Sequence, residues 1–241
     1  MAIDELWLIR HGESVGNAAA TEAEREGWDR ISLDVRDADV ELSGTGIEQA
    51  EALRAWMSAR RPVIDVFWVS PYVRARQTLA IALSDARPTP AVVIDERLRD
   101  RELGILDLLT TRGVAHLHPD EAERRRRLGK FYHRPPGGES WADVALRLRS
   151  FLQDATENPG RVALVVAHDA VVMLFLYVLV GMDERSLLDF AAANTVLNAS
   201  VTHVARTSDG WQVIEFSSVD HLVESGADVT VHPGSPDVEP N

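Results

Sequence analysis

The apolar residues of the chain fall into short runs that alternate with longer segments of helical periodicity. Runs of strand length occupy 5–10, 64–69, 91–94 and 161–167, and helical patterns occupy 44–60, 72–84, 139–156 and 169–180. Two later runs, 197–205 and 211–217, are typical of strands joined by a turn at 208–210. Because strands alternate with helices, the pattern predicts an α/β fold of three layers, α/β/α, with a mostly parallel central sheet and helices on both faces.

The remaining predictions concern two helix starts, an excursion from the core and the C-terminal tail. Ser43 is suited to cap the helix at 44–60, and Ser70-Pro71 precedes the helix at 72–84. Residues 105–138 are predicted to leave the core as an excursion, or cap, that is helical around 120–128 and ends in a Pro-Pro-Gly-Gly loop. Residues 218–241 are acidic and contain Pro and Gly, so we expect a loosely ordered tail after a domain at 1–217.

The most apolar stretch, 162–182, is long enough to span a membrane. His168 and Asp169 interrupt it, however, and its first half has the composition of a strand. A buried strand followed by a buried helix is therefore the preferred interpretation. The N-terminal residues lack a basic region followed by an apolar one, so we expect no signal peptide and a cytoplasmic location.

The amino-acid composition of the chain excludes several kinds of site and partner. The chain of 241 residues has no cysteine, which excludes disulfides, thiolate metal sites and a cysteine nucleophile. Its 38 acidic and 25 basic residues give a formal net charge of −13. This charge disfavours nucleic acid and membrane partners, and it would repel an anionic substrate unless basic side chains gather at the site. The positions of individual arginines are therefore informative.

Polar segments follow the predicted strands, where open α/β sheets bind their ligands. His11 comes directly after the first strand, and a neutral imidazole can attack phosphorus. Arg10 beside it can hold phosphate oxygens with planar donors, and Gly12 lets the backbone approach a ligand closely.

The other segments add the remaining functional groups. Arg74 lies in the first turn of a helix whose N-terminus can bind an anion, and His168 follows the strand at 161–167. The loop at 96–104 offers carboxylates among arginines for general acid and base catalysis. Each feature alone has an ordinary structural explanation, as a solvated arginine, a buried histidine or a charged surface loop. Their combination at one sheet edge indicates phosphoryl transfer.

Four motifs carry a resemblance to a known family. They are Leu-Ile-Arg-His-Gly-Glu-Ser at 8–14 with Asn17, Leu-Ser-Gly-Thr-Gly at 42–46 with Gln49-Ala50, Ser70-Pro71 with 74–78, and Gly-Gly-Glu-Ser at 137–140. From about residue 4 to 217, the chain resembles the histidine phosphatase superfamily, in the branch that includes the cofactor-dependent phosphoglycerate mutases. The resemblance implies a phosphoglycerate-mutase-like fold and a phosphohistidine on His11. It also implies a phosphate pocket of Arg10, Arg74 and His168, contact of Asn17 with the phosphoryl group, and no metal or other cofactor.

The sequence departs from that family at two positions. Asp100 stands where the family usually has the glutamate that serves as general acid, so Asp100 is the expected acid and Glu102 the fallback. Arg101, between them, is expected to contact the substrate. Asp169 replaces the common glycine after the second histidine, where it would cap the following helix or raise the pKa of His168.

Three functions remain open. A phosphatase acting on a small phosphorylated substrate is preferred, because residues 103–108 lack the mutases' tyrosine-glycine pattern. A mutase is the second, and a weakly active binding or regulatory protein is the third. The basic run at 124–127 is interpreted as a solvated helix face, with attraction of anionic substrates as the alternative. The identity of the substrate and assembly into a homo-oligomer are left open.

Overall fold

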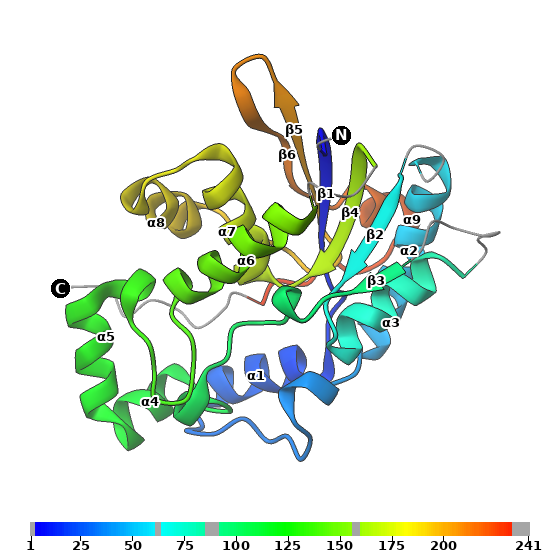
Figure 1. The fold of residues 1–241 in the computed structure, drawn as a ribbon. Coiled ribbons are helices and arrows are strands. Elements are labelled where there is room, and N and C mark those ends of the chain that lie inside the picture. Colours follow the sequence, from blue (N-terminus) through cyan, green and yellow to red (C-terminus); the bar gives the residue numbers. More distant parts are fainter. Residues whose placement is uncertain (1–2, 61–63, 85–91, 156–159, 233–241) are drawn as a thin grey trace.

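A six-stranded sheet forms the centre of the molecule (Figure 1), and the computed structural model describes residues 3–60, 64–84, 92–155 and 160–232. The strand order is β3-β2-β4-β1-β5-β6. Strands β1 to β4 run parallel, whereas β5 pairs antiparallel with both β1 and β6. The strands are β1 (Glu5–Arg10), β2 (Val66–Val69), β3 (Val92–Ile94), β4 (Val162–Ala167), β5 (Val201–Thr207) and β6 (Gly210–Ser218). The predicted mostly parallel sheet is confirmed.

Helices cover both faces of the sheet, as predicted (Figure 1). One face carries α6 (Trp141–Ala155), α7 (Asp169–Val180) and α8 (Glu184–Ala193), and the other carries α2 (Gly44–Arg60), α3 (Val73–Ala82) and α9 (Asp220–Ser225). Successive strand residues point to opposite faces, so Leu8 and Val165 join the first core and Ile9 and Val166 the second. Burial of both faces explains why the central strands β2 and β4 are apolar throughout.

Most predicted elements correspond closely to the observed ones, but β2 begins two residues later than predicted and β5 begins four residues later and ends two residues later. Residues 91 and 156, at the ends of a predicted strand and helix, lie outside the described residues. Helices α1 (Val15–Glu26) and α8 were not predicted. Alanine and polar residues make up most of α1, which buries Ala23 alone, so it has no apolar stripe to reveal it.

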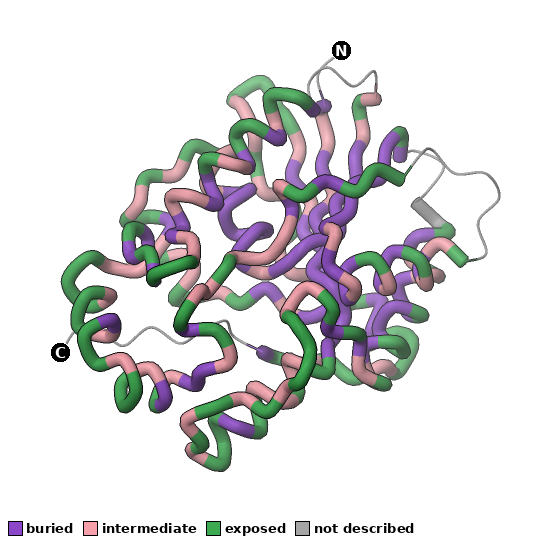
Figure 2. Tube along the Cα trace, turned by 60° about the horizontal axis from the view of Figure 1, so that its bottom comes forward, coloured by how far each residue is buried: buried purple, intermediate pink, exposed green. Residues whose placement is uncertain are grey.

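The excursion at 105–138 contains two helices, α4 (Thr111–Leu117) and α5 (Pro119–Tyr132), and lies beyond the carboxyl ends of the parallel strands together with α1 (Figure 1). Figure 2 shows that much of this region is exposed, whereas the central strands β2 and β4 are buried. Gly113 of α4 approaches the backbone of Asp29 so closely that a Cβ would lie 1.8 Å from its carbonyl oxygen. This contact fixes α4 against the segment that follows α1.

The prediction of a loosely ordered tail is wrong for residues 218–232. Strand β6 runs to Ser218, and α9 buries Leu222 completely. The chain then passes α2, from which Gln49 donates its side-chain amide to the Asp228 carbonyl and the Thr230 hydroxyl. Hydrogen bonds hold this segment, and apolar patterning alone could not reveal them. Residues 233–241 lie outside the described residues.

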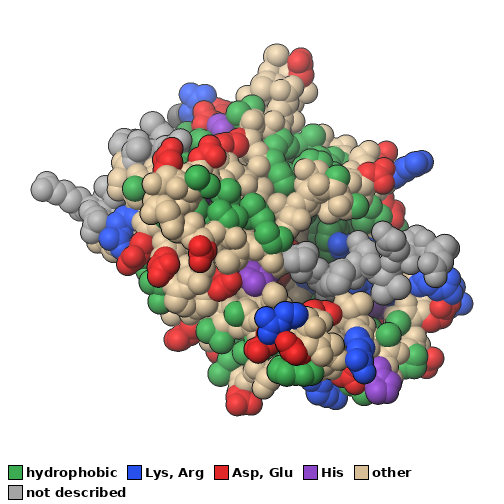
Figure 3. Space-filling model, turned by 180° about the vertical axis from the view of Figure 1, so that it is seen from behind, with side chains coloured by type: hydrophobic (Ala, Val, Ile, Leu, Met, Phe, Trp, Pro, Cys, Tyr) green, Lys and Arg blue, Asp and Glu red, His purple; other side chains and the backbone are tan. Residues whose placement is uncertain are grey.

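The long apolar stretch at 162–182 divides at His168 into β4 and α7, as predicted. No helix within the described ranges is long and apolar enough to cross a membrane. On the face shown in Figure 3, acidic and basic side chains are interspersed.

Candidate active site

His11 lies at the end of β1 and is buried, with 2% of its surface exposed. Its Nδ1 lies 2.6 Å from the carbonyl oxygen of Gly12. Because a carbonyl oxygen only accepts hydrogen bonds, Nδ1 carries the hydrogen and Nε2 keeps a lone pair. The Nε–H of Arg74 donates to that lone pair at 3.2 Å. The imidazole is therefore fixed in the tautomer that a nitrogen nucleophile at Nε2 requires.

The surroundings also keep His11 neutral. Burial lowers its pKa well below the ordinary value of 6.5, and the positive charges of Arg74 and Arg10 and the ring of His168 lower it further. The hydrogen bond to the Gly12 carbonyl opposes this shift without reversing it. The ring is consequently unprotonated at neutral pH, which is the form that can attack an electrophile.

The backbone around His11 is held from three sides. The side-chain amide of Asn198 and the backbone N–H of Ala199 both donate to the His11 carbonyl, at 3.2 and 3.1 Å. Ala199 has a φ of 52°, a left-handed conformation that costs free energy for a residue other than glycine and that aims its N–H at His11. Thr78 accepts from the Gly12 N–H at 3.0 Å. The loop after β1 is thus fixed before any ligand arrives.

Arg10 is buried beside His11. Its two terminal nitrogens donate to the carbonyl oxygens of Val196 and His232, at 2.6 and 3.0 Å. Its Nε has no hydrogen-bond partner among the described residues. Since a guanidinium has five N–H groups, Arg10 retains donors for a bound anion.

Arg74 lies in the first turn of α3, the helix that follows β2. Every N–H group of its guanidinium is engaged in a hydrogen bond. Besides Nε to His11, Nη1 donates to the Asp37 carbonyl oxygen at 2.6 Å and to its carboxylate at 2.9 Å. Nη2 donates to the carboxylates of Asp37 at 3.3 Å and Asp100 at 3.1 Å. All five donors are therefore engaged within the protein. Nothing in the sequence pattern indicated Asp37, which lies in a loop with no regular periodicity.

His168 caps α7 at the end of β4 and faces His11, with 5.1 Å between the ring centroids. Its Nε2 lies 2.8 Å from the Ser70 hydroxyl, and its Nδ1 lies 3.3 Å from Asp100 Oδ2. Burial, followed by the charges of nearby arginines, lowers the pKa of His168 well below 6.5. Both roles predicted for Asp169 are therefore wrong: His168 occupies the N-cap position, and burial outweighs any effect of Asp169 on the pKa of His168.

The two acid candidates occupy different places. Asp100 touches both Arg74 and His168, so its carboxylate belongs to the His11 cluster. Glu102 is exposed and accepts the Tyr72 hydroxyl at 2.8 Å. Of the two candidates, Asp100 is therefore the one that contacts Arg74 and His168.

The two predicted substrate-binding residues are separated in space. Asn17 lies near His11: its side-chain oxygen accepts from the Ser14 N–H at 3.1 Å and from the Asn198 amide at 3.3 Å. Arg101 instead donates to the carbonyl oxygen of Glu139 at 2.7 Å. Burial, with repulsion from Arg125, lowers the pKa of Arg101 to about 10. Arg101 thus packs against the loop before α6 rather than against His11.

The C-terminal segment contributes a second cluster that sequence reasoning missed. His232 Nε2 lies 2.8 Å from the Glu13 carboxylate, and Nδ1 lies 2.6 Å from the Thr21 hydroxyl. Ser43 donates its hydroxyl to the other Glu13 oxygen at 2.6 Å. Because 219 positions separate Glu13 from His232, no local pattern could indicate this contact. The cluster ties the loop after His11 to the segment that carries the carbonyl acceptor of Arg10.

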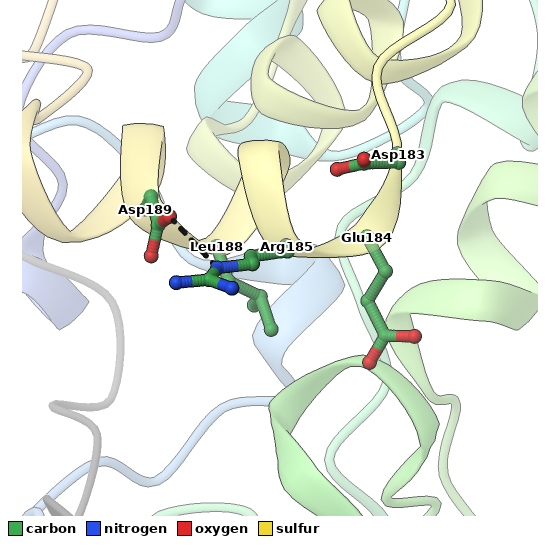
Figure 4. A pocket seen from close by; sticks show the side chains of 5 residues that line it. All are labelled: Asp183, Glu184, Arg185, Leu188 and Asp189. Carbon is green, nitrogen blue, oxygen red and sulfur yellow. Dashed lines mark ion pairs between the residues drawn. The ribbon is translucent and has the colours of Figure 1, made fainter.

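Within the described ranges, no group of three or more histidine and acidic side chains is arranged to hold a metal ion. A surface hollow of about 400 Å³ lies on α8 (Figure 4), lined by Asp183, Glu184, Arg185, Leu188 and Asp189. Arg185 is paired there with Asp189 at 3.7 Å, and none of these residues belongs to the His11 cluster.

Comparison with known proteins identifies the family and related folds. The model of the histidine phosphatase superfamily (branch 1) matches residues 6–218. The chain is 31% identical to "Probable phosphoglycerate mutase GpmB" of Yersinia enterocolitica over 90% of this chain and 94% of that one. It is 26% identical to a metal-independent phosphoserine phosphatase of Arabidopsis thaliana, over 93% and 85%. A mycobacterial glucosyl-3-phosphoglycerate phosphatase has a similar fold, with a TM-score of 0.70, 24% identity and coverage of 90% and 100%.

Proposed function

Because the chain belongs to the histidine phosphatase superfamily (branch 1), we propose that it is a metal-independent phosphatase that hydrolyses small phosphomonoesters through a phosphohistidine on His11. One observation carries the proposal: the buried, neutral His11 presents the lone pair of Nε2 beside the Arg74 guanidinium. Names among the relatives include phosphatases and mutases, and both kinds of enzyme transfer a phosphoryl group.

In the first step, the Arg74 Nε–H releases the lone pair of His11 Nε2, which attacks phosphorus, and the bond from phosphorus to the leaving oxygen breaks. Asp100 takes up a proton from solvent as the anionic substrate binds and gives it to that oxygen, so the product leaves as an alcohol. Arg10, Arg74 and His168 stabilise the negative charge on the transferring group with N–H donors. In the second step, the Asp100 carboxylate takes a proton from water, the water oxygen attacks phosphorus, and the N–P bond breaks. Inorganic phosphate is released and His11 regains its lone pair.

Binding requires an exchange at Arg74. Its five N–H groups are all engaged in the ligand-free protein, so a phosphoryl group has to replace some of these partners. Asp37 is the partner best placed to leave, because its side chain is 40% exposed and lies in a short turn. The phosphoryl oxygens then take the donors that its carboxylate releases.

Mutase activity is the second candidate, favoured by the relative that shares 31% identity over 90% of the chain. It would use the same phosphohistidine but return the phosphoryl group to a sugar acid instead of to water. The segment at 103–108 supports the phosphatase, because it lacks the tyrosine-glycine pattern of the mutases. A small phosphorylated substrate and a cytoplasmic location belong to the same proposal.

The test is the release of phosphate from an activated aryl phosphate, without added metal, by the wild type and by His11→Ala. The matched control is His116→Ala, which removes an exposed histidine paired with Asp29. We expect turnover in the wild type and control and none in His11→Ala, together with acid-labile labelling of the wild type by a ³²P-substrate. Absence of turnover and labelling in the wild type would refute the proposal. Labelling without hydrolysis, followed by transfer to a phosphoglycerate, would establish the mutase instead.

A further inference from the structure

His168 can assist phosphoryl transfer only if the correct ring nitrogen carries the hydrogen. The ring is completely buried, and its low pKa keeps it neutral in the free protein. A neutral imidazole has one N–H donor and one lone pair, so the two tautomers present opposite groups to the site. Nε2 faces Ser70, and Nδ1 faces the carboxylate of Asp100, which also pairs with Arg74.

The hydrogen bonds of Ser70 decide between the tautomers. Ser70 is completely buried, and its hydroxyl oxygen accepts the backbone N–H of Tyr72 at 3.3 Å. Its remaining contact is His168 Nε2, at 2.8 Å. If Nε2 carried the hydrogen, Ser70 would accept twice, and its own buried O–H would have no acceptor in the described part of the chain. If Ser70 donates to Nε2, every polar group of this contact is satisfied.

The other side of the ring leads to the same assignment. Nδ1 is buried, forms no hydrogen bond within the described residues, and lies 3.3 Å from Asp100 Oδ2. A lone pair on Nδ1 would face this carboxylate and, after binding, an anionic phosphoryl oxygen. An N–H there faces acceptors in both states.

We propose that Ser70 is a positioning residue that fixes His168 as the Nδ1–H tautomer, so that His168 donates a hydrogen bond to the transferring phosphoryl group. The catalytic half of this inference rests on the proposed function, whereas the tautomer does not. Ser70 acts through His168 and does not itself reach the phosphoryl group. Its hydroxyl can also rotate to accept from Nε2 if His168 becomes protonated during the reaction.

The tautomer is measured directly by two-bond ¹H–¹⁵N NMR of the full-length protein, with the signals of His168 identified by their loss in His168→Gln. We expect Nδ1–H in the wild type, an increased share of Nε2–H in Ser70→Ala, and the wild-type tautomer in Ser70→Thr, which keeps the hydroxyl. Nε2–H in the wild type, which can be tested even if Ser70→Ala does not fold, would overturn the proposal. An unchanged tautomer in Ser70→Ala would overturn it as well.

Aryl phosphate hydrolysis provides the second measurement. We expect kcat of Ser70→Ala to fall about five- to tenfold, the equivalent of one net hydrogen bond, with a smaller change in KM. Ser70→Thr should recover most of that loss, and Ser58→Ala, which removes an exposed hydroxyl on α2, should leave kcat unchanged. If the wild type shows no turnover, the proposed function fails while the NMR result still decides the tautomer. Equal kcat in Ser70→Ala and the wild type would show that the tautomer does not serve the reaction.

Discussion

Replacing Asp37 by asparagine should strengthen the binding of inorganic phosphate. The Asp37 carboxylate holds two nitrogens of Arg74, at 2.9 and 3.3 Å, and a phosphate ion needs the same donors. Asparagine keeps the shape of the side chain but removes its charge. The backbone carbonyl of residue 37 still accepts from Nη1, so the turn keeps one of its attachments. The substitution therefore weakens the internal competitor without removing the guanidinium that both anions use.

The magnitude follows from the contacts that are lost. A hydrogen bond to a charged group contributes about 1.5–3 kcal/mol, and the exposed part of the Asp37 side chain places this pair at or below the low end. Loss of the carboxylate charge should therefore release about 1 kcal/mol of competition. Because each 1.4 kcal/mol corresponds to a factor of ten, the Kd for phosphate should fall about fivefold.

Isothermal titration of the ligand-free protein with phosphate measures this Kd, and competitive inhibition of aryl phosphate hydrolysis gives an independent value. Asp39→Asn is the matched control, since Asp39 pairs with the exposed Arg36 and does not touch Arg74. A Kd that is unchanged or higher in Asp37→Asn would show that Asp37 orients Arg74 rather than competing for it. An equal gain in both variants would reveal a general effect of net charge.

Three other results are expected. Asp100→Asn should lower kcat for an alkyl phosphate about 10²-fold or more, because the alkoxide leaving group needs a proton. Kinetics of the same variant with an activated aryl phosphate should show a much smaller loss of kcat. Gly46→Ala should lower the free energy of unfolding, measured in urea, by about 1–3 kcal/mol, because the added Cβ would lie 1.9 Å from the Glu13 carbonyl oxygen. Gly44→Ala is the control without this clash, because its Cβ would meet nothing within 4 Å. Burial lowers the pKa of His11 well below 6.5, so the ring stays neutral as the pH falls through 6.5. In a pH profile of kcat/KM, the loss of activity caused by protonation of His11 should therefore begin well below pH 6.5.

The sequence predicted those parts of the site that follow from strand topology. His11 and His168 come directly after β1 and β4, and Arg74 lies in the first turn of the helix that follows β2; these three strands are parallel neighbours. Parallel strands end at the same edge, so the order of elements brings these side chains together. Asp100 was indicated by its position in a motif, and the structure brings it to the same cluster.

Other contacts could not be predicted because nothing local encodes them. Asp37 and Asn198 lie in irregular segments and meet the site through loop conformation. His232 lies in a segment with few apolar residues, where hydrogen bonds to Glu13 and Arg10 replace the missing hydrophobic burial. A composition that suggests disorder can therefore belong to an ordered segment when buried polar groups elsewhere need its backbone and side chains as partners.

The same need for partners explains how an acidic chain can contain a site for an anion. The chain has a formal net charge of −13, and Arg74 is buried in it. An unpaired guanidinium at this buried position would lower the stability of the folded protein. Asp37 and Asp100 supply the counter-charge while the site is empty. A phosphoryl group carries similar charge and geometry, so it can replace one carboxylate without leaving Arg74 unpaired. The pairing that stabilises the ligand-free protein must therefore reduce its affinity for phosphate, because both anions use the same N–H groups.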